Sequence, residues 1–182
     1  SPVILGESAL VIDDTPGISI AELRSKCRKL KLEKNLGLII IDYLQLMSGS
    51  GGRSSDSRQQ EISDISRSLK EIARELQVPV LALSQLSRAV EQRPDHRPML
   101  SDLREAGAIE QDADVVLLLY RPALARIPTD RESGYPTEGL GIIIVAKQRN
   151  GETGNAYFGH NPEMTKITDY VPPLEFLLKH AK

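Results

Sequence analysis

Apolar residues recur along this chain with two different periods, one that suits helices and one that suits strands. The clearest helical stripe consists of five residues at steps of three and four: Ile62, Ile65, Leu69, Ile72 and Leu76. A second stripe lies within residues 20–30, and Ser19 and Glu22 at its start have the spacing of a capping box. The pattern therefore predicts two amphipathic helices, one to about residue 35 and one through the five-residue stripe.

Short apolar runs predict strands before, between and after these helices. These runs cover residues 9–13, 38–41, 78–84 and 115–120. Two further runs, Ile142–Gln148 and Asn155–Phe158, flank RNGETG, whose Asn-Gly pair is typical of a tight hairpin turn. Residues 165–170 are a further candidate strand. Strands that alternate with helices and are then followed by strands predict an α/β fold, a parallel sheet with an antiparallel edge.

The remaining segments are predicted to be loops or short helices. Residues 48–58 are rich in Gly and Ser and are expected to be flexible, and residues 87–100 and 121–139 read as loops. A short helical stretch is expected from Ser101 onward, and an apolar segment lies near the carboxyl end at Leu174–Leu178.

Composition narrows the function classes. The 182 residues include 40% apolar and 26% charged residues, which is ordinary for one globular domain. The net charge of −2 argues against a generally basic nucleic-acid surface, so DNA binding would need local positive loops. The single cysteine, Cys27, suits a reducing cytosol and lies on a helical stripe, which predicts a core position. Asp13 and Asp14 sit in a turn signal, DDTPG, and favour an Asx turn over a metal site.

One predicted strand ends in an acidic residue that could bind a metal ion. The run LGLIIIDYLQLM delivers Asp42 to the carboxyl end of a buried strand, the edge at which α/β sheets bind ligands. In P-loop enzymes such a carboxylate holds Mg²⁺, although a strand-end Asp that caps a turn explains the same position. The phosphate-binding pattern G-x-x-x-x-G-K-[ST] does not occur in these residues, so the sequence predicts half of a nucleotide site.

Four segments in a fixed order then point to a family: IIIDYLQL, ALSQLSR, SDLREAGAIEQDADVVLLLYR and AKQRNGETG. Together they resemble the carboxyl-terminal motor domain of bacterial replicative DNA helicases of the DnaB type. The resemblance implies a RecA-like P-loop NTPase core over residues 1–182, as a single, partial domain. It implies a mostly parallel sheet with helices on both faces, a C-terminal antiparallel hairpin, and a central Walker A strand that these residues lack.

The resemblance also implies roles in nucleotide chemistry for four residues. Asp42 would coordinate Mg²⁺ through water, and Gln85 would sense the γ-phosphate, a task that suits an amide because it can both donate and accept. Lys147 and Arg149 would reach the nucleotide site of a neighbouring subunit as a finger supplied in trans. Ordinary explanations stay open: Gln85 could bond to local backbone, and the basic pair could simply protect a hairpin edge.

Three further residues are implied in DNA binding. Arg104, Glu105 and Gly107 would form a loop against the DNA backbone in a central channel, independent of base sequence. Glu105 cannot attract phosphate, so we expect it to pair with an arginine of the next subunit. A surface Arg–Glu pair at a helix start is the alternative. Residues 51–58 are a weaker candidate for a second channel loop, and a plain connector is at least as good an explanation.

The implied function is that of part of a hexameric replicative helicase. Such a helicase hydrolyses ATP or another NTP with Mg²⁺, translocates on single-stranded DNA and unwinds the duplex at the fork. The implied partners are other copies of the chain, single-stranded DNA, primase and a helicase loader, in the cytoplasm near the nucleoid and without a membrane. By itself the chain is expected to be inactive and to be unstable or prone to association, because a gap in its sheet would expose strand edges and an apolar face.

Two other functions compete with this one. A RecA- or RadA-like recombinase would share Asp42 and a DNA loop but would form open filaments. A non-catalytic assembly domain is the second alternative, and the joint presence of Asp42, Gln85, Lys147 and Arg149 argues against it.

Overall fold

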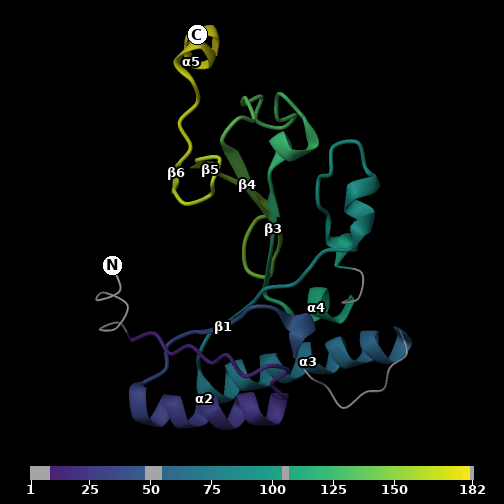
Figure 1. The fold of residues 1–182 in the computed structure, drawn as a ribbon, viewed down its shortest axis with the longest axis vertical. Helices are drawn as coiled ribbons and strands as arrows, with labels where there is room; N and C mark the ends of the chain where they lie inside the picture. Colours follow the sequence, from purple (N-terminus) through teal and green to yellow (C-terminus); the bar gives the residue numbers. More distant parts are fainter. Residues whose placement is uncertain (1–8, 48–54, 104–106, 181–182) are drawn as a thin grey trace. The chain divides into compact units, whose positions relative to one another are not determined.

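The computed structural model describes residues 9–47, 55–103 and 107–180 (Figure 1). Its α-helices are α2 (Ile20–Lys34), α3 (Ser55–Leu76), α4 (Gly107–Asp112) and α5 (Leu174–His180). Its strands are β1 (Ile39–Ile41), β2 (Val80–Ala82), β3 (Val115–Tyr120), β4 (Leu140–Gln148), β5 (Gly154–His160) and β6 (Ile167–Asp169). The chain divides into two compact units, one of residues 1–85 and 105–112 and one of residues 86–104 and 113–182.

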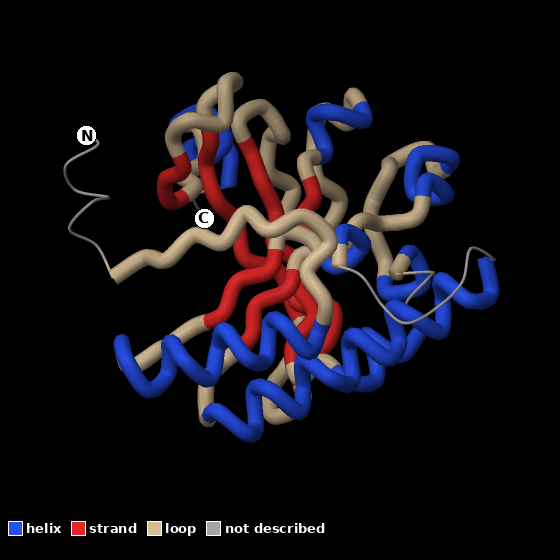
Figure 2. Tube along the Cα trace, turned by 60° about the horizontal axis from the view of Figure 1, so that its bottom comes forward, coloured by secondary structure: helices blue, strands red, loops and turns tan. Residues whose placement is uncertain are grey.

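The first unit is a parallel pair of strands with helices packed on one face. β1 and β2 pair in register, Ile39 with Val80 and Ile41 with Ala82, and these four side chains face the helices. Figure 2 shows α2 and α3 side by side along this sheet. The predicted α3 stripe is confirmed, because all five of its residues are at most 8% exposed.

The opposite face of this sheet is apolar and exposed. Ile40, Leu81 and Leu83 alternate with the core-facing residues and are 57%, 49% and 42% exposed. Alternation along a strand forces these side chains onto one face. A strand that is apolar on both faces is typical of a sheet covered on both sides, so this face is the part of the unit that most needs a partner.

The ends of α2 follow from local chemistry. The hydroxyl of Ser19 accepts a hydrogen bond from the backbone N–H of Glu22 at 3.3 Å, as the capping-box spacing predicts. At the other end Asn35 adopts a left-handed conformation, with φ of 51°, which stops the helix. Cys27 is 4% exposed in the core, as predicted, and burial raises the pKa of its thiol.

Two element predictions in this unit are wrong. Residues 9–13 form no strand, and the side chain of Ile12 is 81% exposed, because no neighbouring strand within the described residues pairs with them. Residues 55–58, which belong to the segment expected to be flexible, already form the first turn of α3.

The second unit is an antiparallel sheet in the order β3-β4-β5-β6. The predicted hairpin is confirmed: β4 and β5 pair from Leu140–Gly159 to Val145–Gly154 on either side of the RNGETG turn. Its core consists of Tyr120, Leu140 and Ile142, with partly buried tyrosines around them. β3 alternates between this core and the surface, so that Leu119, for example, is 69% exposed.

Gly141 is required at one close approach in this sheet. It pairs with Phe158 across β4 and β5, and a Cβ at Gly141 would lie 2.1 Å from the Phe158 ring. Any larger residue would displace the ring. The absence of a side chain at Gly141 therefore leaves room for the Phe158 ring over β4.

The predicted α/β class is confirmed, with a parallel pair in one unit and antiparallel strands in the other. The antiparallel part is larger than the predicted hairpin, because β3 and β6 join it on either side. The segment at residues 87–100 contains a 3-10 turn at Arg88–Gln92 and another begins at Leu100. No helix in the described ranges has the length and apolarity that a membrane crossing requires.

Candidate functional site

Asp42 and Gln85 follow the two paired strands of the first unit at the same edge. Asp42 comes directly after β1, and Gln85 lies three residues beyond β2. Two backbone hydrogen bonds continue the pairing past the strands, from Leu83 N–H to the Ile41 carbonyl at 2.9 Å and from Leu44 N–H to the Leu83 carbonyl at 3.0 Å. Both candidate side chains are exposed, so each is available to a ligand at this edge.

Gln45 ties the two strand ends together. Its side-chain amide donates to the hydroxyl of Ser84 at 3.0 Å, and its carbonyl oxygen accepts from the backbone N–H of Gln85 at 3.4 Å. Gln45 belongs to the YLQL sequence that follows Asp42, and Leu44 beside it is 2% exposed in the core. The residues after Asp42 therefore anchor the loop into the core and fix the backbone on which Gln85 stands.

The basic pair lies at the end of the hairpin in the second unit. Lys147 is the next-to-last residue of β4, and Arg149 begins the turn that follows. Arg149 forms an ion pair with Asp114 at 3.2 Å, and its backbone N–H donates to the Asp114 carbonyl at 2.8 Å. The Arg149 side chain is 48% exposed. Such a half-exposed guanidinium can leave one carboxylate for another anion at small cost.

The candidate DNA residues are only partly covered. Arg104 and Glu105 lie outside the described residues, as do residues 51–54 of the weaker loop candidate, and Gly107 is the first residue of α4. What the structure describes is the segment that leads into Arg104, which ends in a 3-10 turn at Leu100–Asp102.

Asp102, which the sequence analysis did not single out, organises this segment. It is 3% exposed and forms a two-pronged ion pair with Arg93, one prong at 3.1 Å. Its carboxylate also accepts from the backbone N–H of Met99 at 2.7 Å. Burial alone would raise the pKa of Asp102, but the bonds from Arg93 and Met99 outweigh it, so the pKa lies below its usual value.

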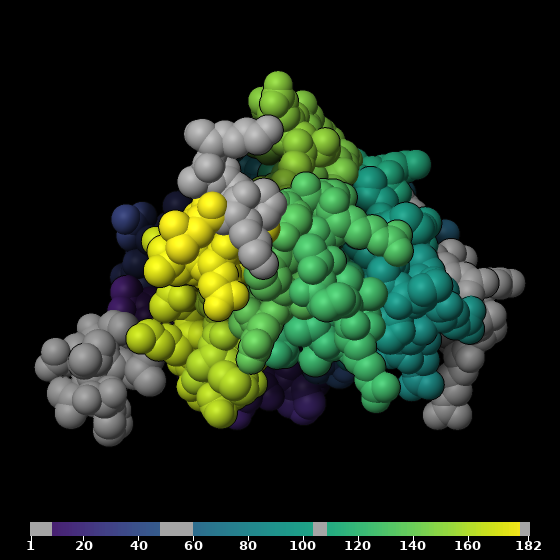
Figure 3. Space-filling view, turned by 90° about the horizontal axis from the view of Figure 1, so that it is seen from above, coloured from purple at the N-terminus to yellow at the C-terminus, as the bar shows by residue number. Residues whose placement is uncertain are grey.

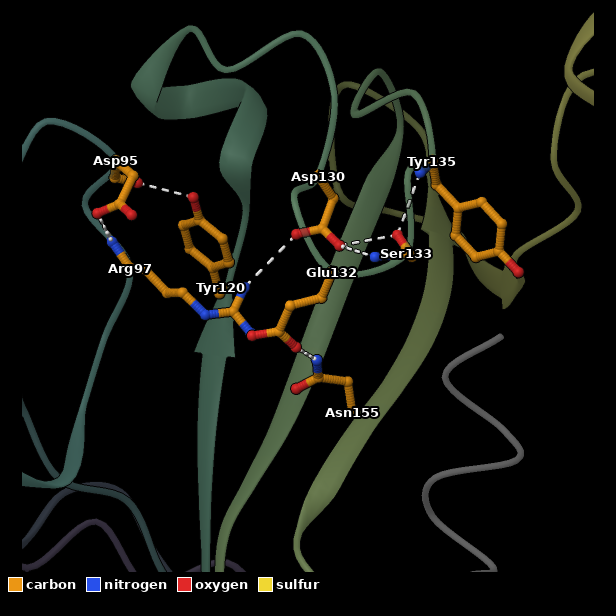
Figure 4. Close-up of polar contacts among 8 residues, drawn as sticks. All are labelled: Asp95, Arg97, Tyr120, Asp130, Glu132, Ser133, Tyr135 and Asn155. Atoms are coloured by element: carbon orange, nitrogen blue, oxygen red, sulfur yellow. Dashed lines mark hydrogen bonds and ion pairs between the residues drawn. The ribbon is translucent and has the colours of Figure 1, made fainter.

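Arg97 is a second residue that the sequence analysis did not select. Its guanidinium lies between Asp130, at 3.5 Å, and Glu132, at 2.7 Å, and stacks 5.5 Å above the ring of Tyr120 (Figure 4). The Tyr120 hydroxyl donates to the Asp95 carbonyl at 2.7 Å, and burial raises its pKa, so it remains a donor. These contacts join residues up to 35 positions apart, which no short motif reveals.

Asp13 takes the role that its turn signal predicts. Its carboxylate accepts from the backbone N–H of Thr15 at 3.0 Å, which is an Asx turn. Lys26 lies 2.7 Å from the same carboxylate, and hydrogen bonds from Lys26 and Thr15 lower the pKa of Asp13 to about 2. Other basic residues of α2 pair with α3, Arg24 with Glu71 and Arg28 with Glu75, as expected for a solvated helix face.

Comparison with known proteins identifies the family. The family described as DnaB-like helicase C terminal domain matches residues 3–169. The chain belongs to this family. It is 58% identical over 167 residues to the replicative DNA helicase DnaC of Bacillus subtilis (strain 168), and 54% identical over the same length to the replicative DNA helicase DnaB of Geobacillus stearothermophilus. Each match covers 91% of this chain and 35% of the relative, so the chain spans about a third of those helicases' length.

Solved structures of DnaB-like helicases have the same fold. One solved ATPase domain superimposes with a TM-score of 0.78 at 44% identity, over 92% of this chain and 57% of that domain. A DnaB-like replicative helicase, studied for its interactions with primase, gives the same TM-score and identity over 92% of this chain and 39% of that one. The fold predicted from the resemblance is thus confirmed as that of DnaB-like ATPase domains.

Proposed function

We propose that this chain is part of a ring-forming replicative DNA helicase that couples NTP hydrolysis to movement along single-stranded DNA and duplex unwinding. The observation that carries the proposal is the common sheet edge that bears Asp42 and Gln85, in a chain that belongs to the DnaB-like helicase family. A carboxylate and an amide at the carboxyl ends of adjacent parallel strands suit a metal-bound triphosphate.

In this proposal Asp42 holds Mg²⁺ through a water molecule. Its exposed carboxylate after β1 fits that role, since Mg²⁺ prefers oxygen ligands and retains several waters. When bound, Mg²⁺ supplies neutralisation of the charge on the β- and γ-phosphates. Gln85 stands at the edge where its amide could report the γ-phosphate, and Gln45 fixes its backbone in place.

Lys147 and Arg149 act on a neighbouring subunit's nucleotide in this proposal. Their place at the end of β4 supports it, because a hairpin end can extend a cation beyond its own domain. Arg149 would exchange its half-exposed partner Asp114 for the charge that develops on the transferred phosphoryl group. The finger role requires an oligomer, and a ring built from heterologous contacts would allow one subunit's hairpin to reach the next subunit's site.

Arg104, Glu105 and Gly107 form the DNA loop of the proposed helicase. Arg104 supplies charge and Gly107 permits close approach of backbone to phosphate, so binding would not depend on base sequence. The overall charge of −2 suits contacts restricted to such a loop. A structure of a DnaB-like helicase concerned with primase supports primase as a partner of this protein too. A helicase loader and a cytoplasmic, nucleoid-associated location complete the proposal.

The phosphate-binding segment of the site is proposed to come from residues outside these 182. Two observations support this: Ile40, Leu81 and Leu83 present an exposed apolar face, and the chain covers only 57% of a solved ATPase domain of the same fold. A further strand and its helix would cover that face. The isolated chain should therefore bind nucleotide weakly and should not unwind DNA.

The recombinase and assembly-domain alternatives make different predictions. A RecA-like recombinase would form open filaments on DNA, whereas the proposed helicase forms closed rings, which electron microscopy distinguishes. An assembly domain would not depend on Arg149 for hydrolysis. Membership in the DnaB-like helicase family favours the helicase over both.

The test uses a full-length chimera, in which the matched part of this chain replaces the corresponding segment of the Bacillus subtilis helicase DnaC. In the chimera, Arg149→Ala is expected to lower the rate of ATP hydrolysis by on the order of 10³-fold, the usual worth of an arginine finger. Arg28→Ala is the matched control, because Arg28 pairs with Glu75 on an exposed helix face and has no proposed role. Unchanged hydrolysis in the Arg149 variant would contradict the proposal.

A further inference from the structure

The segment between Gln85 and the DNA loop closes on itself. The backbone N–H of Ser87 donates to the carbonyl of Asp102 at 2.8 Å, so the two ends of the segment are hydrogen-bonded. Arg93, from the middle of the segment, forms the ion pair with the buried Asp102 carboxylate. We refer to residues 86–103 as the strap. Its two ends and its middle are thus joined to one another.

Arg97 fastens the strap to the rest of the second unit. The side chain is 22% exposed and reaches from the strap to Asp130 and Glu132, in the loop of residues 121–139. Figure 3 shows the strap (teal) against that loop (green). Asp130 is 2% exposed in its side chain, and its other oxygen accepts from both the N–H and the hydroxyl of Ser133 at 2.8 Å. The Asp130 carboxylate that Arg97 contacts is therefore itself held in place.

The chain of contacts continues from Arg97 to the hairpin. Glu132 accepts with its second oxygen from the amide of Asn155, which is in β5 and pairs with Ile144 of β4 (Figure 4). The Arg97 guanidinium also lies over Tyr120 of β3, the neighbour of β4. The Arg97 side chain thus links the strap, to which it belongs, with the 121–139 loop and with β3. Through Glu132 it is also connected to β5.

A ligand-binding role for Arg97 fits the structure less well. A cavity of about 320 Å³ borders Arg97, Met99 and Asn155. The guanidinium already faces two carboxylates, one of them buried, so an anion entering the cavity would have to displace them. The contacts of Arg97 instead indicate a structural link between the strap and the 121–139 loop.

We propose that Arg97 is a positioning residue that makes the strap and the β4–β5 hairpin move as one body. The strap leads into Arg104 of the DNA loop, and the hairpin carries Lys147 and Arg149, so Arg97 would couple DNA contact to action on the neighbouring subunit's nucleotide. The inference rests on the proposed function, because it takes the roles of the DNA loop and the basic pair from it. Coupling of this kind requires an element that both sites bias, and in this proposal the strap, held by Arg97, is that element.

Removing Arg97 should release the strap without dismantling the unit. Asp130 keeps its two hydrogen bonds from Ser133, and the strap keeps its own closure through Arg93 and Asp102. The sheet pairing of β3 with β4 and of β4 with β5 does not involve Arg97. Asp130, which is 2% exposed, loses its cation, so some thermal stability should be lost, but the retained contacts should keep the unit folded and the main defect is expected in communication.

The experiment measures the rate of ATP hydrolysis by the full-length chimera with and without single-stranded DNA. It also measures the affinity for single-stranded DNA in the presence of a non-hydrolysable ATP analogue. The variants are Arg97→Ala, Glu132→Gln, which keeps a polar group at a side chain that is 54% exposed, and the control Arg28→Ala. In Arg97→Ala and Glu132→Gln the ratio of DNA-stimulated to basal rate is expected to fall at least about 5-fold, with basal rate and DNA affinity within about 2-fold of the parent.

The outcomes separate coupling from plain structural support. A stimulation ratio that is unchanged in both variants, or that falls as much in Arg28→Ala, overturns the proposal. A proportional fall of both rates overturns it too, because that is the signature of lost folding or lost catalysis. If Arg97→Ala fails to fold, the result for Glu132→Gln decides. Absence of DNA stimulation in the parent, or full hydrolysis in Arg149→Ala, would instead refute the proposed function before any Arg97 variant is tested.

Discussion

Truncation of Ile72 tests whether α3 supports the sheet that carries Asp42 and Gln85. Ile72 is fully buried in the core formed by α2, α3 and the β1–β2 pair. Ile72→Ala removes three carbon atoms, which costs about 2.4 kcal/mol at about 0.8 kcal/mol per buried methylene. The cavity left behind adds a cost that depends on how far the core collapses, so the expected loss of unfolding free energy is about 2–5 kcal/mol. Better helix propensity of Ala returns only a few tenths of a kcal/mol.

Urea unfolding of the 182-residue chain, followed by far-ultraviolet circular dichroism, measures this loss. The signal reports mainly on the first unit, because that unit contains both long helices, α2 and α3. Leu32→Ala is the matched control: Leu32 is on α2 and 87% exposed, so the change should stay within about 0.5 kcal/mol. A loss for Ile72→Ala as small as that of the control would refute the packing described for this core.

Other predictions concern groups outside the nucleotide site. The pKa of Asp13 is lowered to about 2, so the stability that it contributes is present above about pH 4, its ordinary pKa, and is lost as pH falls toward 2. In acid titrations followed by circular dichroism, an Asp13→Asn chain should therefore lose less stability over that range. Burial raises the pKa of Cys27, so a thiol reagent should label the folded chain slowly and the urea-unfolded chain fast, and equal rates would contradict its core position. Arg93→Ala leaves the buried Asp102 carboxylate without its cation and should lower the thermal midpoint more than Arg28→Ala does, which differential scanning fluorimetry can compare.

Local elements were largely predictable because their signals are local. The α3 stripe, the Ser19 cap and the Asn-Gly hairpin each depend on residues a few positions apart, and the structure confirms all three. Residues 9–13 show the limit of such signals. An apolar run becomes a strand only if a partner strand is available, and pairing is a property of the whole fold.

The candidate site was predictable only in part, for a related reason. Asp42 could be selected because it follows an apolar strand, whereas Gln85 was selected through the resemblance to DnaB-type helicases. Their common edge follows from parallel pairing. Arg97 and Asp102 carry no such mark, since their contacts reach Asp130 at a separation of 33 residues and Arg93 at a separation of 9. Among polar loop residues only three-dimensional proximity distinguishes a buried ion pair from a solvated charge.

Mixing two variants tests whether Arg149 acts on a neighbouring subunit. Chimera subunits with Asp42→Asn and subunits with Arg149→Ala, each expected to hydrolyse ATP only slowly by itself, are mixed, reassembled and assayed for ATP hydrolysis. If the site is shared, about a quarter of the sites in an equal mixture combine an intact Asp42 with an intact neighbouring Arg149. A shared site should restore hydrolysis above that of either variant alone. No recovery from two folded, co-assembled variants would contradict it.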